Sequence, residues 1–110
     1  MKSEIKQDVF KAIADPTRRA ILLLLAVQSA TPNALAEEFD TTRQAVSKHI
    51  KVLAECGMVK QNRSGREIYY ELQPEKLNEV DGWIQTLKQQ WQSKFEQLDT
   101  VLQQLKNKRK

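Results

Sequence analysis

Apolar residues recur every seven positions in the last third of the chain, and this spacing predicts one long helix over residues 74–106. The repeat position and the position three residues further on are occupied by Leu77, Val80, Ile84, Leu87, Trp91, Lys94, Leu98, Val101 and Leu105. Phe95 and Leu102 widen this stripe. A helix of this size is about 45 Å long, which is longer than a small core can cover. We therefore expect a dimer seam; the alternative is that the helix folds back over the core of its own chain.

The first third of the chain has the apolar spacing of two helices. One covers residues 5–14 and carries its apolar side chains on one face. The second covers residues 17–29, and its run Ile21–Leu25 is apolar almost all round, so we expect this helix to be central to the core. Arg18 and Arg19 lie in its first turn, where the helix dipole disfavours cations. We expect them in solvent, with a phosphate contact as the alternative.

Two short helices joined by a tight turn are predicted next, over residues 31–56. Thr31 and Thr42 are good N-cap residues, and Gly57 can take the left-handed conformation that ends a helix. The apolar residues of the second helix, which share one face, are Val46, Ile50 and Leu53. Its opposite face carries Gln, Ser and Lys, which can bond base edges or phosphates. This pair predicts a helix-turn-helix whose second helix is the recognition helix.

The segment 58–72 has the pattern of a β-hairpin, which is called a wing when it follows a recognition helix. Both arms contain β-branched or aromatic residues at strand spacing. The turn is expected over Asn62–Arg66, where Gly65 can take a positive φ. The tip of this wing then carries Arg63 and Arg66.

The positive charge of the chain is concentrated on the predicted recognition helix and wing. The 110 residues include 18 Lys and Arg and 14 Asp and Glu, which gives a net charge of +4. Residues 41–66 hold six of the bases and one acid, whereas the rest of the chain holds 12 bases and 13 acids. A phosphate-binding surface needs such a local excess. We therefore expect double-stranded DNA as a partner, and chance clustering is the alternative.

Length and composition restrict the remaining classes of protein. At this length we expect a single domain over residues 1–110, and no apolar run is long enough to span a bilayer, so no membrane partner is expected. The single Cys cannot form an internal disulfide, which fits a cytoplasmic protein. An enzyme is not expected, because one His and no Gly-rich phosphate loop provide no nucleophile–base–orienter set.

A metal site is not expected either. Zinc needs about four ligands, mostly thiolates or imidazoles, and only His49 and Cys56 are of those types. They lie seven residues, about two turns, apart on one predicted helix and could not chelate the same ion within a subunit. We expect Cys56 to be a small space-filling residue. For His49 two roles stay open, namely half-buried support of the helix and a DNA contact.

Several motifs, in the same order, resemble the ArsR/SmtB family of bacterial winged-helix repressors. They are Val9–Leu22, Gln44–Leu53, Gly57–Val59 and Gly65-Arg66 followed by Ile68–Leu72. The long Trp-containing helix resembles a branch of that family that does not sense metals. The resemblance implies a mainly α fold with a small β-hairpin wing (α+β), that is, a winged helix-turn-helix with a long C-terminal dimerisation helix.

The resemblance also implies a homodimer, paired through its first and last helices, that represses transcription from a palindromic operator. We expect no cofactor. The residues expected at DNA, from the charge pattern and the resemblance together, are Thr42, Arg43, Gln44, Ser47, Lys48, His49, Lys51, Arg63 and Arg66. The residues expected in the dimer interface are Ile5, Val9, Leu77, Val80, Ile84, Leu87, Trp91, Leu98 and Leu102. Metal-sensing members carry paired cysteines where this chain has Ala34–Phe39, which agrees with metal independence.

Two alternatives to a simple repressor stay open. In one, a small organic ligand or a partner protein acts as an effector that loosens the dimer and releases DNA. In the other, the winged helix mediates protein–protein contact without sequence-specific DNA binding, although the local positive charge argues against this.

Overall fold

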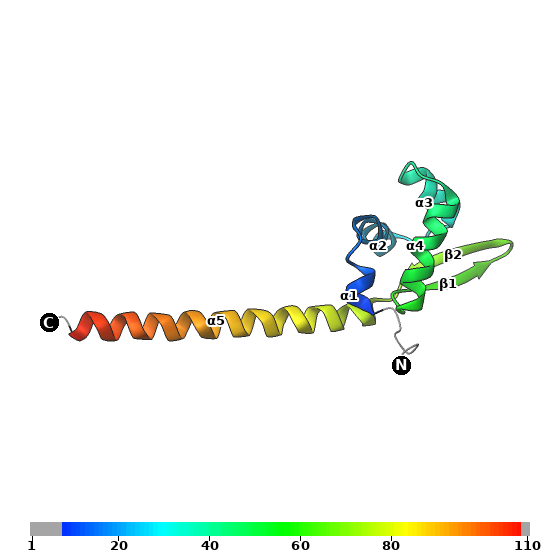
Figure 1. The fold of residues 1–110 in the computed structure, drawn as a ribbon. Helices are drawn as coiled ribbons and strands as arrows, with labels where there is room; N and C mark the ends of the chain where they lie inside the picture. Colours follow the sequence, from blue (N-terminus) through cyan, green and yellow to red (C-terminus); the bar gives the residue numbers. More distant parts are fainter. Residues whose placement is uncertain (1–7, 109–110) are drawn as a thin grey trace, which may run out of the picture. The chain divides into compact units, whose positions relative to one another are not determined.

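The computed structural model describes residues 8–108 of the chain (Figure 1). The elements are α1 (Val9–Ala12), α2 (Pro16–Val27), α3 (Pro32–Glu38), α4 (Arg43–Glu55), β1 (Val59–Ser64), β2 (Glu67–Leu72), a 3-10 turn (Pro74–Lys76) and α5 (Leu77–Lys108). They fall into two compact units, one ending at Glu79 and the other beginning at Val80. The predicted winged helix-turn-helix with a two-stranded wing and a long last helix is confirmed. Within residues 8–108, no helix has the length and apolar character needed to cross a membrane.

Local signals in the sequence set where the helices of the first unit begin. Each starts after a residue with extended backbone whose side chain accepts a hydrogen bond from a backbone N–H three residues further on. These caps, with donor–acceptor distances of 2.8–3.1 Å, are Asp8, Asp15, Thr31 and Thr42. Pro16 and Pro32 open α2 and α3, where a missing N–H costs no hydrogen bond.

α1 is shorter than the helix predicted over residues 5–14, because the backbone of its cap, Asp8, is extended and the helix begins only at Val9. The structure also corrects the predicted dimer interface. Val9 is 3% exposed and packs in the core of its own chain rather than on a surface open to a partner. Ile5, the other interface residue predicted in this helix, lies outside the described residues.

Two arginines of α2 hold the C-terminal end of α1. Arg18 donates from Nε to the carbonyl oxygen of Ala12 at 2.7 Å and from Nη2 to that of Lys11 at 3.1 Å. Arg19 donates from Nη1 to the carbonyl oxygen of Ile13 at 2.7 Å. Guanidinium groups suit this place because the last carbonyls of a helix lack intrahelical partners. The expectation that Arg18 is solvated was therefore wrong.

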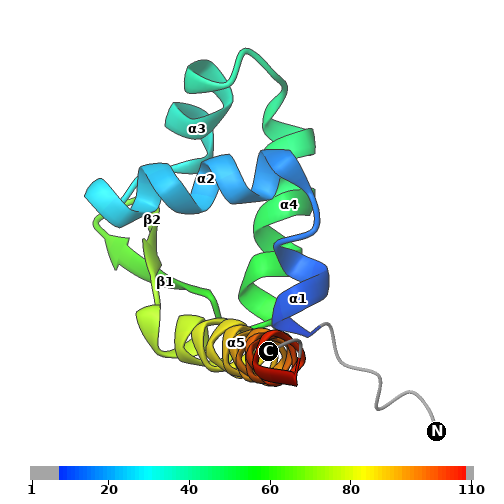
Figure 2. The same cartoon turned by 90° about the vertical axis from the view of Figure 1, so that its left-hand side faces the viewer.

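α2 and α4 cross in the first unit and contribute much of its core (Figure 2). The core side chains that are at most 3% exposed are Val9, Ala12, Ile21, Leu35, Val46, Ile50, Leu53, Met58 and Val59. The predicted apolar face of α4 is thus confirmed as its buried face. α2 lies in the core as predicted, through Ile21, Leu22 and Leu25, but Leu23 and Val27 are 73% and 82% exposed on the face opposite Ile21.

The strands of the wing pair without interruption from Val59 and Leu72 to Ser64 and Glu67. The turn therefore consists of Gly65 and Arg66 alone, and the turn predicted over Asn62–Arg66 was too long. Gly65 has a φ of +64°, as required at the first position of a two-residue hairpin turn. Backbone hydrogen bonds of 2.8 and 3.2 Å between Ala30 and Tyr70 tie β2 to the segment before α3.

The apolar stripe of α5 is exposed in the single chain. Leu77 and Ile84 are 36% and 37% exposed, Val80 is half-buried, and large apolar residues from Leu87 to Leu105 are 48–61% exposed. A contiguous stripe of this size is rarely left in water by a monomeric protein. The stripe is therefore an exposed apolar surface of α5, and its pairing with a second chain stays a prediction.

Gly57 ends α4 and turns the chain into the wing. Its N–H donates to the carbonyl oxygen of Ala54 at 3.0 Å, and the N–H of Met58 donates to that of Leu53 at 2.9 Å. This pair of hydrogen bonds is a Schellman motif, in which the residue after the helix takes the left-handed conformation. Gly57 has a φ of +76°, as the motif requires.

We expect Gly57→Ala to lower the free energy of unfolding by about 1–2 kcal/mol, because a Cβ makes the left-handed conformation unfavourable. The added Cβ would also lie 3.0 Å from the Lys76 Cε atom. Gly82→Ala is the matched control: its Cβ would meet no atom within 4 Å, and Ala in a helix should stabilise by about 0.5–1 kcal/mol. Urea unfolding at equal protein concentrations measures both. Shifts of the same sign would contradict this role of Gly57.

Candidate nucleic-acid interface

The outer face of α4 presents the donors that the sequence predicted for it. Gln44, Ser47, Lys48 and Lys51 are all exposed, and Arg43 is exposed at the first helical position. The orientation follows from the buried face, because Val46, Ile50 and Leu53 fix the rotation of the helix about its axis. The cap Thr42 is also exposed, while its Oγ1 accepts the N–H of Ala45 at 3.1 Å.

The wing adds two exposed arginines to this surface. Arg66 lies in the two-residue turn, whereas Arg63 lies in β1 opposite Ile68. In the described part of the chain, the bases that form no ion pair or hydrogen bond include Arg43, Lys48, Lys51, Arg63 and Arg66. No acidic side chain among residues 8–108 pairs with these charges, which are therefore available to phosphates.

His49 lies apart from this exposed face. Its side chain is 26% exposed, and its Nδ1 atom lies 3.4 Å from Arg18 Nη1 and 3.9 Å from Asp15 Oδ2. The N–H of Arg18, which donates to the Asp15 carboxylate, lowers the pKa of Asp15, and His49 adds to this effect. Of the two roles that the sequence left open, this environment favours support: His49 holds α4 against the junction of α1 and α2.

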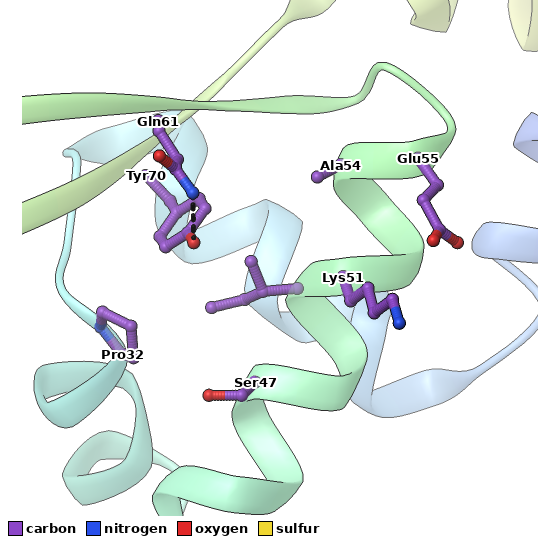
Figure 3. A pocket seen from close by; sticks show the side chains of 8 residues that line it. Pro32, Ser47, Lys51, Ala54, Glu55, Gln61 and Tyr70 are labelled. Atoms are coloured by element: carbon purple, nitrogen blue, oxygen red, sulfur yellow. Dashed lines mark hydrogen bonds between the residues drawn. The ribbon is translucent and has the colours of Figure 1, made fainter.

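A groove of about 330 Å³ separates α4 from the wing (Figure 3). Its lining residues are Pro32, Ser47, Ile50, Lys51, Ala54, Glu55, Gln61 and Tyr70. Gln61 and Tyr70 reach into it from the wing, and the hydroxyl of Ser47 points into it from α4, whereas the ends of Lys51 and Glu55 point away. Gln61 Nε2 donates to the Tyr70 hydroxyl oxygen at 3.2 Å. The groove thus brings together three uncharged hydrogen-bonding groups.

Sequence reasoning missed Gln61 and Tyr70, which lie nine residues apart and become neighbours through the strand register. The signal that could have found them is the length of the turn. A two-residue turn at Gly65 and Arg66 places Gln61 directly opposite Tyr70, whereas the longer turn that we predicted leaves this pairing undefined.

Comparison with known proteins agrees with this geometry. A family model described as a helix-turn-helix domain, HTH_20, matches residues 13–62. The transcriptional repressor SdpR of Bacillus subtilis (strain 168) is 38% identical over 77 residues, which cover 70% of this chain and 86% of SdpR.

Two solved structures extend the comparison to the fold. The ArsR-like transcriptional regulator from Rhodococcus sp. RHA1 is 30% identical with a TM-score of 0.72, over 84% of this chain and 88% of that one. The homodimeric winged helix-turn-helix DNA-binding domain of Mb0332 from Mycobacterium bovis is 27% identical with a TM-score of 0.60, over 74% and 75% of the two chains. By its winged helix-turn-helix and by its identity to such relatives over most of their length, this chain belongs to the ArsR family of DNA-binding transcriptional regulators.

Proposed function

We propose that this protein is a sequence-specific repressor that binds a palindromic operator as a homodimer and does so without a metal. The observation that carries the proposal is the set of exposed bases on α4 and the wing whose side chains have no partner among the described residues. Two relatives support it: SdpR is a transcriptional repressor, and the Mb0332 domain is homodimeric and DNA-binding. ArsR-family regulators bind DNA as homodimers.

In the proposed complex, the two α4 helices of the dimer enter successive major grooves, about one helical turn apart. Gln44, Ser47 and Arg43 face base edges, because they lie on the exposed side of the first turns of α4. Lys48 and Lys51 bind phosphate or guanine. The wing bases, Arg63 and Arg66, reach phosphates or the adjacent minor groove. Thr42 lies at the N-terminal end of α4, next to the residues that face the bases.

Metal independence is proposed from the surroundings of the two residues that could supply a thiolate or an imidazole ligand. Cys56 is buried, its Sγ donates to the carbonyl oxygen of Asp8 at 3.3 Å, and burial raises the pKa of its thiol. A protonated thiol is a poor ligand, since metals bind the thiolate. His49 faces Arg18, whose charge would repel a cation. These residues therefore do not fit a metal site.

Selection of bound duplexes from a random pool tests the proposed function. The expected product is a palindromic motif with two half-sites about one helical turn apart, and binding should be unchanged by EDTA or added zinc. If each subunit neutralises four or five phosphates, log K against log salt should have a slope of about −8. No enriched motif, together with a slope near zero, would favour the protein–protein interaction module instead.

The groove between α4 and the wing adds a proposed contact to the DNA backbone. The Tyr70 oxygen accepts from Gln61, so its own hydrogen is free to donate, and no described atom accepts it. A DNA strand crossing between the recognition helix and the wing would pass over this groove. We propose that Tyr70 donates to one phosphate there.

We expect Tyr70→Phe to weaken operator binding by about 0.5–1.5 kcal/mol per subunit, the usual value of a neutral hydrogen bond. The salt slope should stay unchanged, because no charge is removed. Tyr69→Phe is the matched control, since it removes the same hydroxyl from the adjacent residue, which points to the opposite face of β2. Gel-shift titrations measure both. Equal losses in the two variants would refute the phosphate contact.

A further inference from the structure

The apolar stripe of α5 contains one charged residue near its middle. Lys94 occupies a seam position between Leu87 and Val101, and all other seam positions from Leu77 to Leu105 are apolar. Trp91 lies one turn before it, 61% exposed, with its ring at 5.0 Å and nearly perpendicular to that of Phe95. The partner that Lys94 meets therefore depends on how two copies of α5 pair.

A parallel pair in register places every seam residue against its own copy. Lys94 would then face Lys94 of the partner subunit, and two ammonium groups in a closely packed seam repel each other strongly. A parallel pair shifted by one heptad avoids this contact. It is no longer two-fold symmetric, however, and it leaves apolar residues uncovered at both ends.

We infer that α5 pairs antiparallel with α5 of a second copy, in the register that places Leu77 opposite Lys108 of the partner subunit. This inference rests on the proposed homodimer. Apolar residues then face each other in three pairs, which are repeated by the two-fold axis: Val80 with Leu105 of the partner subunit, Ile84 with Val101 of the partner subunit, and Leu87 with Leu98 of the partner subunit. In this register the two copies of α5 overlap along all 32 residues of the helix.

In this register Lys94 faces Trp91 of the partner subunit, and the contact occurs twice beside the two-fold axis. An ammonium group over an indole face is the most favourable cation–π pair available to Lys. Moving the register by one heptad places Lys94 against either Ile84 or Leu98 of the partner subunit, where no group compensates its charge. The same shifts leave either Leu77 and Val80 or Leu102 and Leu105 without a partner. Lys94 thus selects both orientation and register.

Disulfide trapping tests the register on the full chain. Leu87→Cys and Leu98→Cys are made separately, with different tags, and are oxidised alone and after refolding as a mixture. We expect a cross-linked product only in the mixture, joining the two different chains. Cross-linking of either variant alone would show parallel pairing. Mixtures of Leu87→Cys with Trp91→Cys or Leu105→Cys report the two neighbouring antiparallel registers, and a dominant product in either would overturn the inference.

The wild-type protein controls for Cys56, which is 6% exposed and should not cross-link. Lys94→Leu tests the cause: without the charge, we expect the Leu87→Cys, Lys94→Leu variant to cross-link with itself to a substantial extent. An unchanged pattern would show that Lys94 does not set the orientation. Sedimentation equilibrium distinguishes failure of the homodimer from failure of the proposed register. A monomer refutes the homodimer itself, whereas a dimer with another cross-link refutes only the register.

Discussion

Replacing Leu87 with Asp should convert the protein to monomers and lower operator affinity by at least a hundredfold. Leu87 is 53% exposed in the single chain and lies in the middle of the seam proposed for α5. Burial of each Leu side chain contributes about 1.5–3 kcal/mol, and there are two in a dimer. An unpaired carboxylate in the same place adds a desolvation cost of several kcal/mol. A monomer can bind only one half-site, and joining two sites commonly raises affinity by 10²–10⁴.

The matched control for this substitution is Gln89→Asp. It adds the same charge two residues further along α5, on the face of the helix opposite the stripe, where Gln89 is exposed. We expect this variant to stay dimeric. Sedimentation equilibrium and gel shifts on both variants separate loss of pairing from a general effect of negative charge near DNA. A dimeric Leu87→Asp protein would place the subunit interface somewhere other than on this stripe.

The parts of the fold that could be predicted from sequence depend on contacts between residues close in the chain. The caps Thr31 and Thr42 act on N–H groups three residues away, and Gly57 closes its motif within six residues. The buried face of α4 follows from helical spacing alone. For these reasons the helix-turn-helix and the exposed face of its second helix were predicted correctly.

The parts that could not be predicted depend on contacts that sequence spacing does not specify. Arg18 lies 3.4 Å from His49, which is 31 residues away in the chain, and this contact favours a supporting role for His49. The run Ile21–Leu25 has no polar residue to show which side of α2 faces water, so Leu23 could not be told from its buried neighbours. For α5 the reason is different, because we propose that the surface that covers it belongs to a second chain.

Substitution of Gln44 by Ala should change which operator sequence is preferred. Gln44 is exposed in the first turn of α4. The planar amide of a glutamine carries both a donor and an acceptor, so it can donate to N7 and accept from the amino group of the same adenine. Loss of this pair should cost about 1–3 kcal/mol per subunit at the preferred base pair. The helix itself should not weaken, since Ala has the highest helix propensity and Gln44 is exposed.

The comparison variant for Gln44→Ala is Arg66→Ala in the wing turn, which removes a charge rather than a base contact. We expect Arg66→Ala to weaken binding to all duplexes alike and to reduce the salt slope by about one per subunit. Gln44→Ala should instead leave the salt slope unchanged. It should reduce the loss of affinity that a mismatched base pair causes at one position of each half-site. Titrations of the selected operator, of single-base variants and of a random duplex, each at several salt concentrations, distinguish these results. If Gln44→Ala weakened the operator and the random duplex equally, α4 would be bound to the backbone and would not be the element that reads the sequence.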